Sequence, residues 1–214
     1  MTALIVGSTR LADELVMAFE YGDPDYVHLA ERDADPDALA AAFRTTAVGA
    51  VINAAQPFAT ELTAAVAAAC AAAGLPLLRA LPPSLARIAG SARWRWIDSL
   101  AAAGRAAHDC PGDVLVVLHP PDLVLPGWDR EPARRVYGLG GALSTIDERH
   151  TQLLIAADSG DDDTGYYLKA AEARGLDVVI VRRPHAAGSV SDASAAFAWL
   201  NNVHTINSVG KAEQ

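Results

Sequence analysis

The sequence predicts an α/β fold of two Rossmann-like or flavodoxin-like domains, each with a largely parallel sheet, and a cleft between them. Short apolar segments alternate with segments of helical periodicity, an order typical of parallel sheets with helices on both faces. The chain has 214 residues and is 51% hydrophobic, which is enough for a substantial core. A second run of strand-helix units begins near residue 110, so we expect an N-terminal domain over residues 1–110 and a C-terminal domain over 111–214.

The first domain is expected to contain four strands, over residues 4–7, 26–30, 49–54 and 75–79. Helices are expected between them over residues 11–19, 37–43 and 57–73. Asp35-Pro36 provides an N-cap and a first-turn proline for the second helix, and Gly74 ends the third. A fourth helix is expected over residues 94–107.

The second domain is expected to contain strands over residues 113–118, 134–139, 153–157 and 177–181. Residues 119–131 carry three prolines and predict a loop. Helices are expected over residues 144–150, where Ser144 and Asp147 come close to a capping box, and over 164–174 and 192–203.

The charge of the chain bears on its partners. A net charge of -9 argues against nucleic acid and anionic membranes. Lys169 and Lys211 are the only lysines, so a site for a polyanion needs a local cluster of arginines.

Several features predict a cytoplasmic protein. No apolar run reaches the roughly 18 to 20 residues of a membrane span, and the N-terminus lacks the basic region of a signal peptide. Cys70 and Cys110 have no metal-like spacing and fit a reducing compartment.

The first candidate site is the turn Gly7-Ser8-Thr9-Arg10, between a strand and a helix. Backbone N–H groups at a helix N-terminus favour phosphate. The full dinucleotide fingerprint is absent, because Thr9 and Ala12 stand where the second and third glycines would be. A single glycine after a first strand is also typical of an ordinary tight turn.

The second candidate is Glu31-Arg32, at the end of the second strand. An acidic residue there favours a free ribose hydroxyl, whereas an arginine favours a 2′-phosphate. The pair therefore favours neither NAD nor NADP, and a solvated Glu-Arg pair is an equally good interpretation.

The third candidate is the turn Gln56-Pro57-Phe58, after the third strand. Ligands of open α/β sheets bind outside the carboxyl ends of the strands. Pro57 suits the first position of the helix, and Phe58 offers an aromatic face. The alternative is that Phe58 lies in the core and Gln56 is an ordinary loop amide.

The fourth candidate is Ser159-Gly160, a turn that can hold phosphate or carboxylate. Asp161, Asp162 and Asp163 follow and would repel an anion, and such runs are usually solvated, so no metal site is predicted. His119 stands at a strand end as a general acid or base or as a structural residue, and no catalytic residue is assigned.

Several of these segments resemble the precorrin-6A reductases, the NADPH-dependent reductases of cobalamin biosynthesis. Residues 53–59 resemble their Asp-Ala-Thr-His-Pro-Phe-Ala segment. Residues 7–9, 29–32 and 157–160 resemble their Gly-Gly-Thr, Leu-Ala-Gly-Arg and Lys-Asn/Asp-Ser-Gly segments. The resemblance implies NADPH held by Gly7, Ser8, Thr9, Arg10 and Arg32, and a tetrapyrrole near Gln56, Pro57, Phe58, Ser159 and Gly160.

The chain departs from the family pattern at four polar positions. Asn53 replaces Asp, Ala55 replaces Thr, Gln56 replaces His and Ala157 replaces Lys. Two hypotheses therefore stay open. The chain is a reductase of a corrin precursor, or it is a divergent member without reductase activity that binds, assembles or acts on another substrate.

Overall fold

The computed structural model describes residues 2–22, 25–118, 135–137, 146 and 150–212. The chain forms two compact units. Unit 1 comprises Met1–Pro82 and His185–Gln214, and unit 2 comprises Pro83–Pro184. Within the described residues, no helix is long and apolar enough to cross a membrane.

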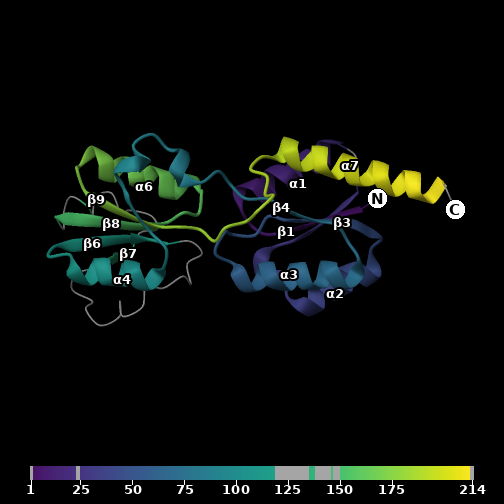
Figure 1. Cartoon of the computed structure of the whole chain (residues 1–214), viewed down its shortest axis with the longest axis horizontal. Helices are drawn as coiled ribbons and strands as arrows, with labels where there is room; N and C mark the ends of the chain where they lie inside the picture. The colour runs from purple at the N-terminus through teal and green to yellow at the C-terminus, as the bar shows by residue number, and fades with distance from the viewer. Residues whose placement is uncertain (1, 23–24, 119–134, 138–145, 147–149, 213–214) are drawn as a thin grey trace. The chain divides into compact units, whose positions relative to one another are not determined.

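Unit 1 is built on a parallel sheet of four strands in the order β2-β1-β3-β4. The strands are β1 (Thr2–Val6), β2 (Tyr26–Leu29), β3 (Val48–Asn53) and β4 (Leu77–Arg79). Helices α1 (Arg10–Gly22) and α7 (Ala193–Ala212) cover one face, and α2 (Pro36–Thr45) and α3 (Thr60–Ala73) cover the other (Figure 1).

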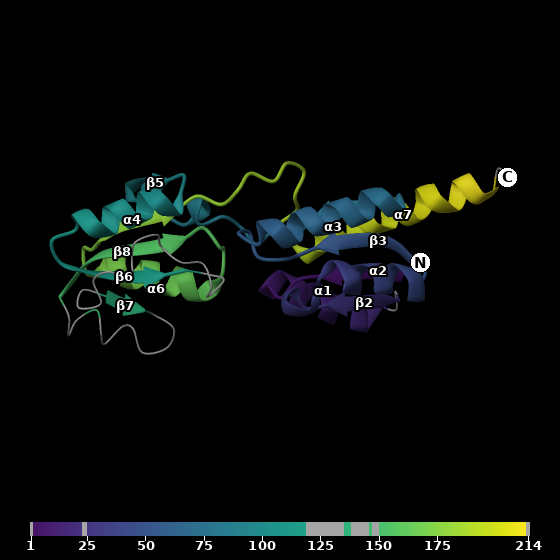
Figure 2. The ribbon, with the colours of Figure 1, turned by 90° about the horizontal axis from the view of Figure 1, so that it is seen from below.

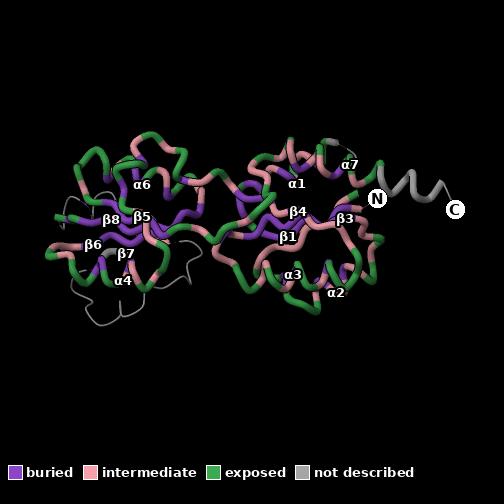
Figure 3. The backbone as a smooth tube through the Cα atoms, viewed as in Figure 1, coloured by how far each residue is buried: buried purple, intermediate pink, exposed green. Residues whose placement is uncertain are grey.

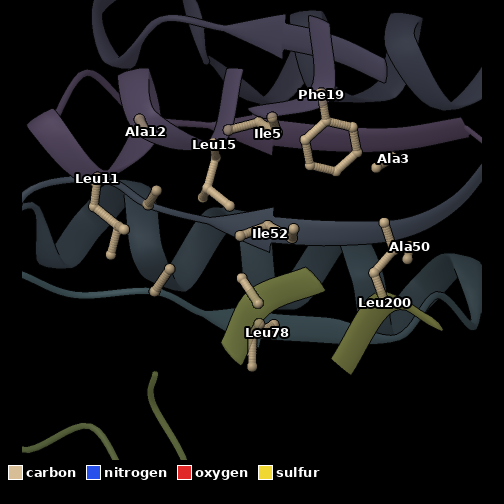
Figure 4. Packing of buried hydrophobic residues seen from close by; sticks show 13 residues of the cluster. Ala3, Ile5, Leu11, Ala12, Leu15, Phe19, Ala50, Ile52, Leu78 and Leu200 are labelled. Atoms are coloured by element: carbon tan, nitrogen blue, oxygen red, sulfur yellow. The ribbon is translucent and has the colours of Figure 1, made fainter. Parts of the chain in front are cut away.

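The two faces of this sheet follow from the alternation of side chains along a strand. Ala3 and Ile5 of β1 pack toward α1 and α7, in the cluster drawn in Figure 4. Leu4 and Val6 pack toward α2 and α3 on the other face. The strand is therefore apolar on both sides, as a central strand of a parallel sheet must be, and its tube is buried in Figure 3.

Unit 2 contains a parallel sheet of five strands in the order β5-β9-β8-β6-β7, which Figure 2 shows from below. The strands are β5 (Arg95–Ile97), β6 (Asp113–Val117), β7 (Arg135–Tyr137), β8 (Thr151–Ala157) and β9 (Asp177–Val181). Helices α4 (Leu100–Asp109) and α6 (Asp162–Ala173) lie on opposite faces (Figure 1).

The parallel strands expected at residues 4–7, 49–54, 113–118, 153–157 and 177–181 are confirmed to within one or two residues at each end. The Asp35 N-cap is also confirmed, because its side chain accepts a hydrogen bond from the backbone N–H of Ala38 at 2.7 Å. The expected loop over 119–131 and all but Ile146 and His150 of the helix expected over 144–150 lie outside the described residues.

Two expected helices begin elsewhere. The helix expected from residue 94 begins at Leu100, where the Ser99 hydroxyl caps it, and the residues before it form β5 on β9. The helix expected from Pro57 begins at Thr60. Pro57 and Phe58 lie in a turn closed by the hydrogen bond from Ala59 N–H to the Gln56 carbonyl, 3.1 Å long.

The observed division of the chain differs from the expected boundary near residue 110. Residues 83–110 belong to unit 2 because β5 pairs with β9, the last strand of that sheet. The C-terminal segment belongs to unit 1 because α7 packs on α1, with Phe19 and Phe197 ring centroids 4.6 Å apart. Local periodicity gives the elements but not these distant pairings.

Helix α6 ends in a Schellman motif. The N–H of Gly175 donates to the Glu172 carbonyl at 3.1 Å, and the N–H of Leu176 donates to the Ala171 carbonyl at 3.0 Å. Gly175 has φ +67°, in the left-handed region that a residue with a Cβ atom enters only at a cost.

We expect Gly175→Ala to destabilise unit 2 by about 1 kcal/mol because of this left-handed φ. Gly165 lies within α6 and has open space where a Cβ would be, so Gly165→Ala should instead stabilise the chain by roughly 0.5 kcal/mol. Urea unfolding of both variants measures this. If both substitutions changed the free energy of unfolding in the same direction, the assignment of the cap would be wrong.

Cys70 gives a second test of the core. Its side chain is buried against β1 and β3, and burial raises the pKa of its thiol to about 11. Because the thiolate is the reactive form, a thiol reagent at pH 8 should label Cys70 only in the unfolded chain.

The raised pKa also predicts a pH dependence. The contribution of the neutral thiol to stability should be lost as the pH rises from about 9 to about 11.

A Cys110→Ser variant isolates the Cys70 signal in the labelling experiment. Fast labelling of that variant in its native state would show that Cys70 is accessible.

Candidate functional site

The carboxyl ends of the four strands of unit 1 lie at one edge of its sheet, because all four strands are parallel. The loops that follow them converge there, at the position where open α/β sheets bind ligands. This edge contains three of the four candidate segments found in the sequence.

The turn after β1 is held tightly against the end of β3. Gly7 has φ +131°, and a Cβ atom built on it would lie 2.4 Å from the backbone of Ala54 and Ala55. The N–H of Gly7 donates to the Leu29 carbonyl at 2.9 Å, and the His28 Nε2 lies 2.8 Å from the Gly7 carbonyl oxygen. Glycine is therefore required at this position by the packing of the strands themselves.

The residues that follow Gly7 divide between structural and exposed roles. Thr9 is buried, and its hydroxyl donates to the Ala54 carbonyl at 2.8 Å and accepts from the N–H of Ala12 at 3.2 Å, which caps α1. Ser8 and Arg10 are exposed. Arg10 forms an ion pair with Glu14, with Nε and Oε1 2.9 Å apart. Ser8 and Arg10 are the side chains of this turn that are open to a ligand.

Glu31 connects the loops of three strands. Its backbone N–H donates to the Ser8 hydroxyl at 2.9 Å, and its Oε2 accepts from the N–H of Gln56 at 2.9 Å. The next residue, Arg32, is exposed and lies 3.4 Å from the carboxylate of Asp33. Glu31 thus holds the turns after β1 and β3 together, whereas Arg32 lies beside them in solvent.

Arg79, the last residue of β4, fixes the turn after β3. Its Nη1 donates to the backbone carbonyl of Asn53 at 2.8 Å and to Asn53 Oδ1 at 3.1 Å, and its Nη2 donates to the Gln56 carbonyl at 3.0 Å. Pro57 is buried in this turn, and Phe58 is half-buried. The guanidinium therefore determines the backbone path on which Gln56 and Phe58 are presented.

Asn53 is fully buried at the centre of this arrangement. Its Oδ1 also accepts from the N–H of Ala55 at 3.1 Å, while its Nδ2 has no hydrogen-bond partner. A buried donor without a partner costs roughly 1–3 kcal/mol. An aspartate here would place an acceptor where Asn53 has this donor.

The carboxyl end of β8 in unit 2 contains a buried ion pair. Asp158 accepts from the Ser84 hydroxyl at 2.8 Å, from the Leu85 N–H at 2.8 Å and from Arg183 Nη2 at 2.9 Å. Arg183 also donates to the Pro83 carbonyl at 3.3 Å. One carboxylate therefore ties together the two places where the chain enters and leaves unit 2.

The neighbouring Ser159-Gly160 turn is occupied by its own helix cap. Asp161 is the N-cap of α6 and accepts from the Thr164 N–H at 2.6 Å. The buried Ser159 hydroxyl donates to this same carboxylate. Asp162 and Asp163 form the first turn of the helix, where acidic residues are favourable. Within the described residues, no group of three His, Cys, Asp or Glu side chains could hold a metal ion.

Comparisons with known proteins agree with this architecture. The family described as precorrin-6x reductase CbiJ/CobK matches residues 15–120. A precorrin-6A reductase from Rhodococcus erythropolis is 27% identical over 192 residues, which cover 78% of this chain and 77% of that protein. Both matches support the precorrin-6A reductase family for this chain.

A solved structure of CobK precorrin-6A reductase has the same fold. It matches with a TM-score of 0.74 and 23% identity, over 95% of this chain and 97% of that one. The region that matches the family includes Glu31, the turn at Gln56 and Arg79, but neither the Gly7 turn nor the Ser159 turn. The resemblance found in the sequence is thus confirmed for the family.

The structure brings together only part of the predicted site. Gly7, Ser8, Thr9 and Arg10 share one edge of unit 1 with Gln56, Pro57 and Phe58, and Arg32 lies beside that edge. Ser159 and Gly160 belong to unit 2.

The sequence interpretation did not include Arg79 in the site. The sequence could have indicated it, because Arg79 is the last residue of an expected strand. The carboxyl ends of parallel strands lie at the same edge of a sheet, which is where the site was expected. The bonding role of Glu31 was also missed, since a bond to a backbone N–H far along the chain leaves no sequence pattern.

We expect Asp158→Ala to destabilise unit 2 by about 3–5 kcal/mol, because it leaves the largely buried Arg183 guanidinium without this carboxylate. The matched control is Asp98→Ala. Asp98 forms an exposed ion pair with the neighbouring Arg182, and its loss should cost less than about 1 kcal/mol. Chemical denaturation compares the two variants, and similar losses would show that the Asp158 pair is not a structural tie.

Proposed function

We propose that this chain is an NADPH-dependent reductase of a corrin-precursor tetrapyrrole of the precorrin-6A type. The observation that carries the proposal is the family match over residues 15–120, which contains the turn at Gln56-Pro57-Phe58. That turn lies at the carboxyl edge of a parallel sheet, where ligands of such folds bind.

The residues at this edge fit a dinucleotide. The first turn of α1 begins beside exposed Ser8 and Arg10, and backbone N–H groups with an arginine favour phosphate. Glu31 and Arg32 follow the neighbouring strand, where a ribose of a bound dinucleotide would lie. When bound, the nicotinamide supplies the hydride. The task of the protein is to hold the nucleotide and to position the substrate.

The substrate contacts follow from exposure. Gln56 and Phe58 are only half-buried, so the amide and the ring are the side chains of their turn that a macrocycle would meet. Pro57 is buried and shapes the turn. In unit 2 the Ser159 hydroxyl holds Asp161, which leaves the backbone around Gly160, at φ +76°, as the part available to a ligand.

The alternative is a divergent family member without reductase activity. It rested on the loss of polar side chains at Asn53, Ala55, Gln56 and Ala157. Ala55 and Ala157 are buried in the structure, so those two replacements lie in the interior of each unit and not on a binding surface. Arg79 also keeps the turn at Gln56 in place with Asn53 beside it. The reductase proposal is therefore the better supported of the two.

NADPH titration followed by calorimetry tests the nucleotide site. We expect the natural chain to bind NADPH and Ser8→Glu to weaken binding about tenfold or more, because the new carboxylate lies beside the phosphates. Ala47→Glu is the control, since Ala47 is exposed and precedes β3, at the opposite edge of the sheet. Absence of binding of both NADPH and NADH at about millimolar concentration, or an equal loss in the control, would contradict this site.

A further inference from the structure

We propose that Glu31 sets the coenzyme preference of this chain: its carboxylate weakens binding of a nucleotide 2′-phosphate, so that NADH competes with NADPH. This inference rests on the proposed nucleotide-binding role of the unit 1 edge. The presence of both Glu31 and Arg32 in the sequence does not decide between NAD and NADP, whereas here the preference depends on Glu31.

Glu31 lies two residues after the end of β2, the neighbour of β1, and 23 positions after Ser8 of the turn after β1. In dinucleotide-binding folds, an acidic residue about 20 positions after the glycine turn contacts the ribose 2′-hydroxyl. The hydrogen bond between the Glu31 N–H and the Ser8 hydroxyl shows that the two loops are adjacent here.

The Glu31 carboxylate is held in place at this edge. The hydrogen bond from Gln56 N–H to Oε2 holds the side chain across the ends of β1 and β3. Its donor is a neutral backbone group, and within the described part of the chain Glu31 forms no ion pair. The negative charge is thus present at the edge without an ion-pair partner among the described residues.

Arg32 is the residue that would attract a 2′-phosphate. Its side chain is 86% exposed, and its Nε lies 3.4 Å from Asp33 Oδ2. An exposed, paired guanidinium attracts an anion weakly, because solvent and the neighbouring carboxylate screen it. The fixed charge of Glu31 therefore outweighs that of Arg32 at the ribose.

Titration of NADPH and NADH, by calorimetry or by nicotinamide fluorescence, tests the inference as binding and not as turnover. Glu31→Gln keeps an acceptor for the Gln56 N–H and removes the charge. We expect the natural chain to bind NADH within about tenfold of NADPH. The variant should bind NADPH about tenfold more tightly, with NADH affinity changed by less than about threefold.

Two further variants complete the design. Glu31→Asp keeps the charge and should keep the natural ratio of the two affinities. Asp25→Asn removes an equal charge from an exposed residue at the opposite end of β2 and should leave the ratio unchanged. Thermal unfolding of each variant shows that the loops remain folded.

The outcomes separate the two proposals. If both nucleotides bind but Glu31→Gln changes the two affinities equally or not at all, Glu31 is only a structural tie and the present inference is overturned. If neither nucleotide binds to the natural chain or to any variant, the proposed nucleotide site itself fails.

Discussion

The candidate site depends on the close contact between the turn after β1 and the end of β3. At Gly7 the two backbones are so near that no Cβ atom fits, and this contact fixes where α1 begins. The Thr9 hydroxyl then joins the start of α1 to the Ala54 carbonyl. Glu31 and Arg79 add bonds from the ends of β2 and β4 to the same turn. All four strand ends are thereby held in one arrangement, so the protein itself organises the candidate site.

The same principle operates in unit 2 with different groups. Asp158 gathers a hydroxyl, a backbone N–H and a guanidinium around one buried carboxylate, which satisfies its charge in the interior. The bonded residues come from both ends of the unit 2 segment, at Pro83–Leu85 and at Arg183. Unit 2 is a single stretch of the chain between two parts of unit 1, and this carboxylate fastens its two ends.

Much of the fold could be predicted from the sequence, because buried parallel strands and the helices between them have strong local signatures. The segments at residues 4–7 and 177–181 are continuous apolar runs, and Asp35-Pro36 is a clear helix start. The predicted start of α3 was wrong because Pro57 fits the first turn of a helix as well as it fits a turn that precedes a helix. The boundary expected near residue 110 differs from the observed one because β5 pairs with β9, a strand that is distant in the sequence.

The site residues show a different limit of sequence patterns. Thr9 and Ser159 stand in motifs that suggest ligand binding, yet each hydroxyl is used to cap or shape its own helix start. A sequence motif that recurs at strand-helix turns therefore indicates the geometry of the turn before it indicates a bound ligand. Ligand contacts then fall to backbone groups and to the few side chains that the turns leave exposed. In unit 1 Ser8 and Arg10 are exposed and Gln56 is half-buried, and under our proposal the charge that Glu31 places among them governs which nucleotide binds.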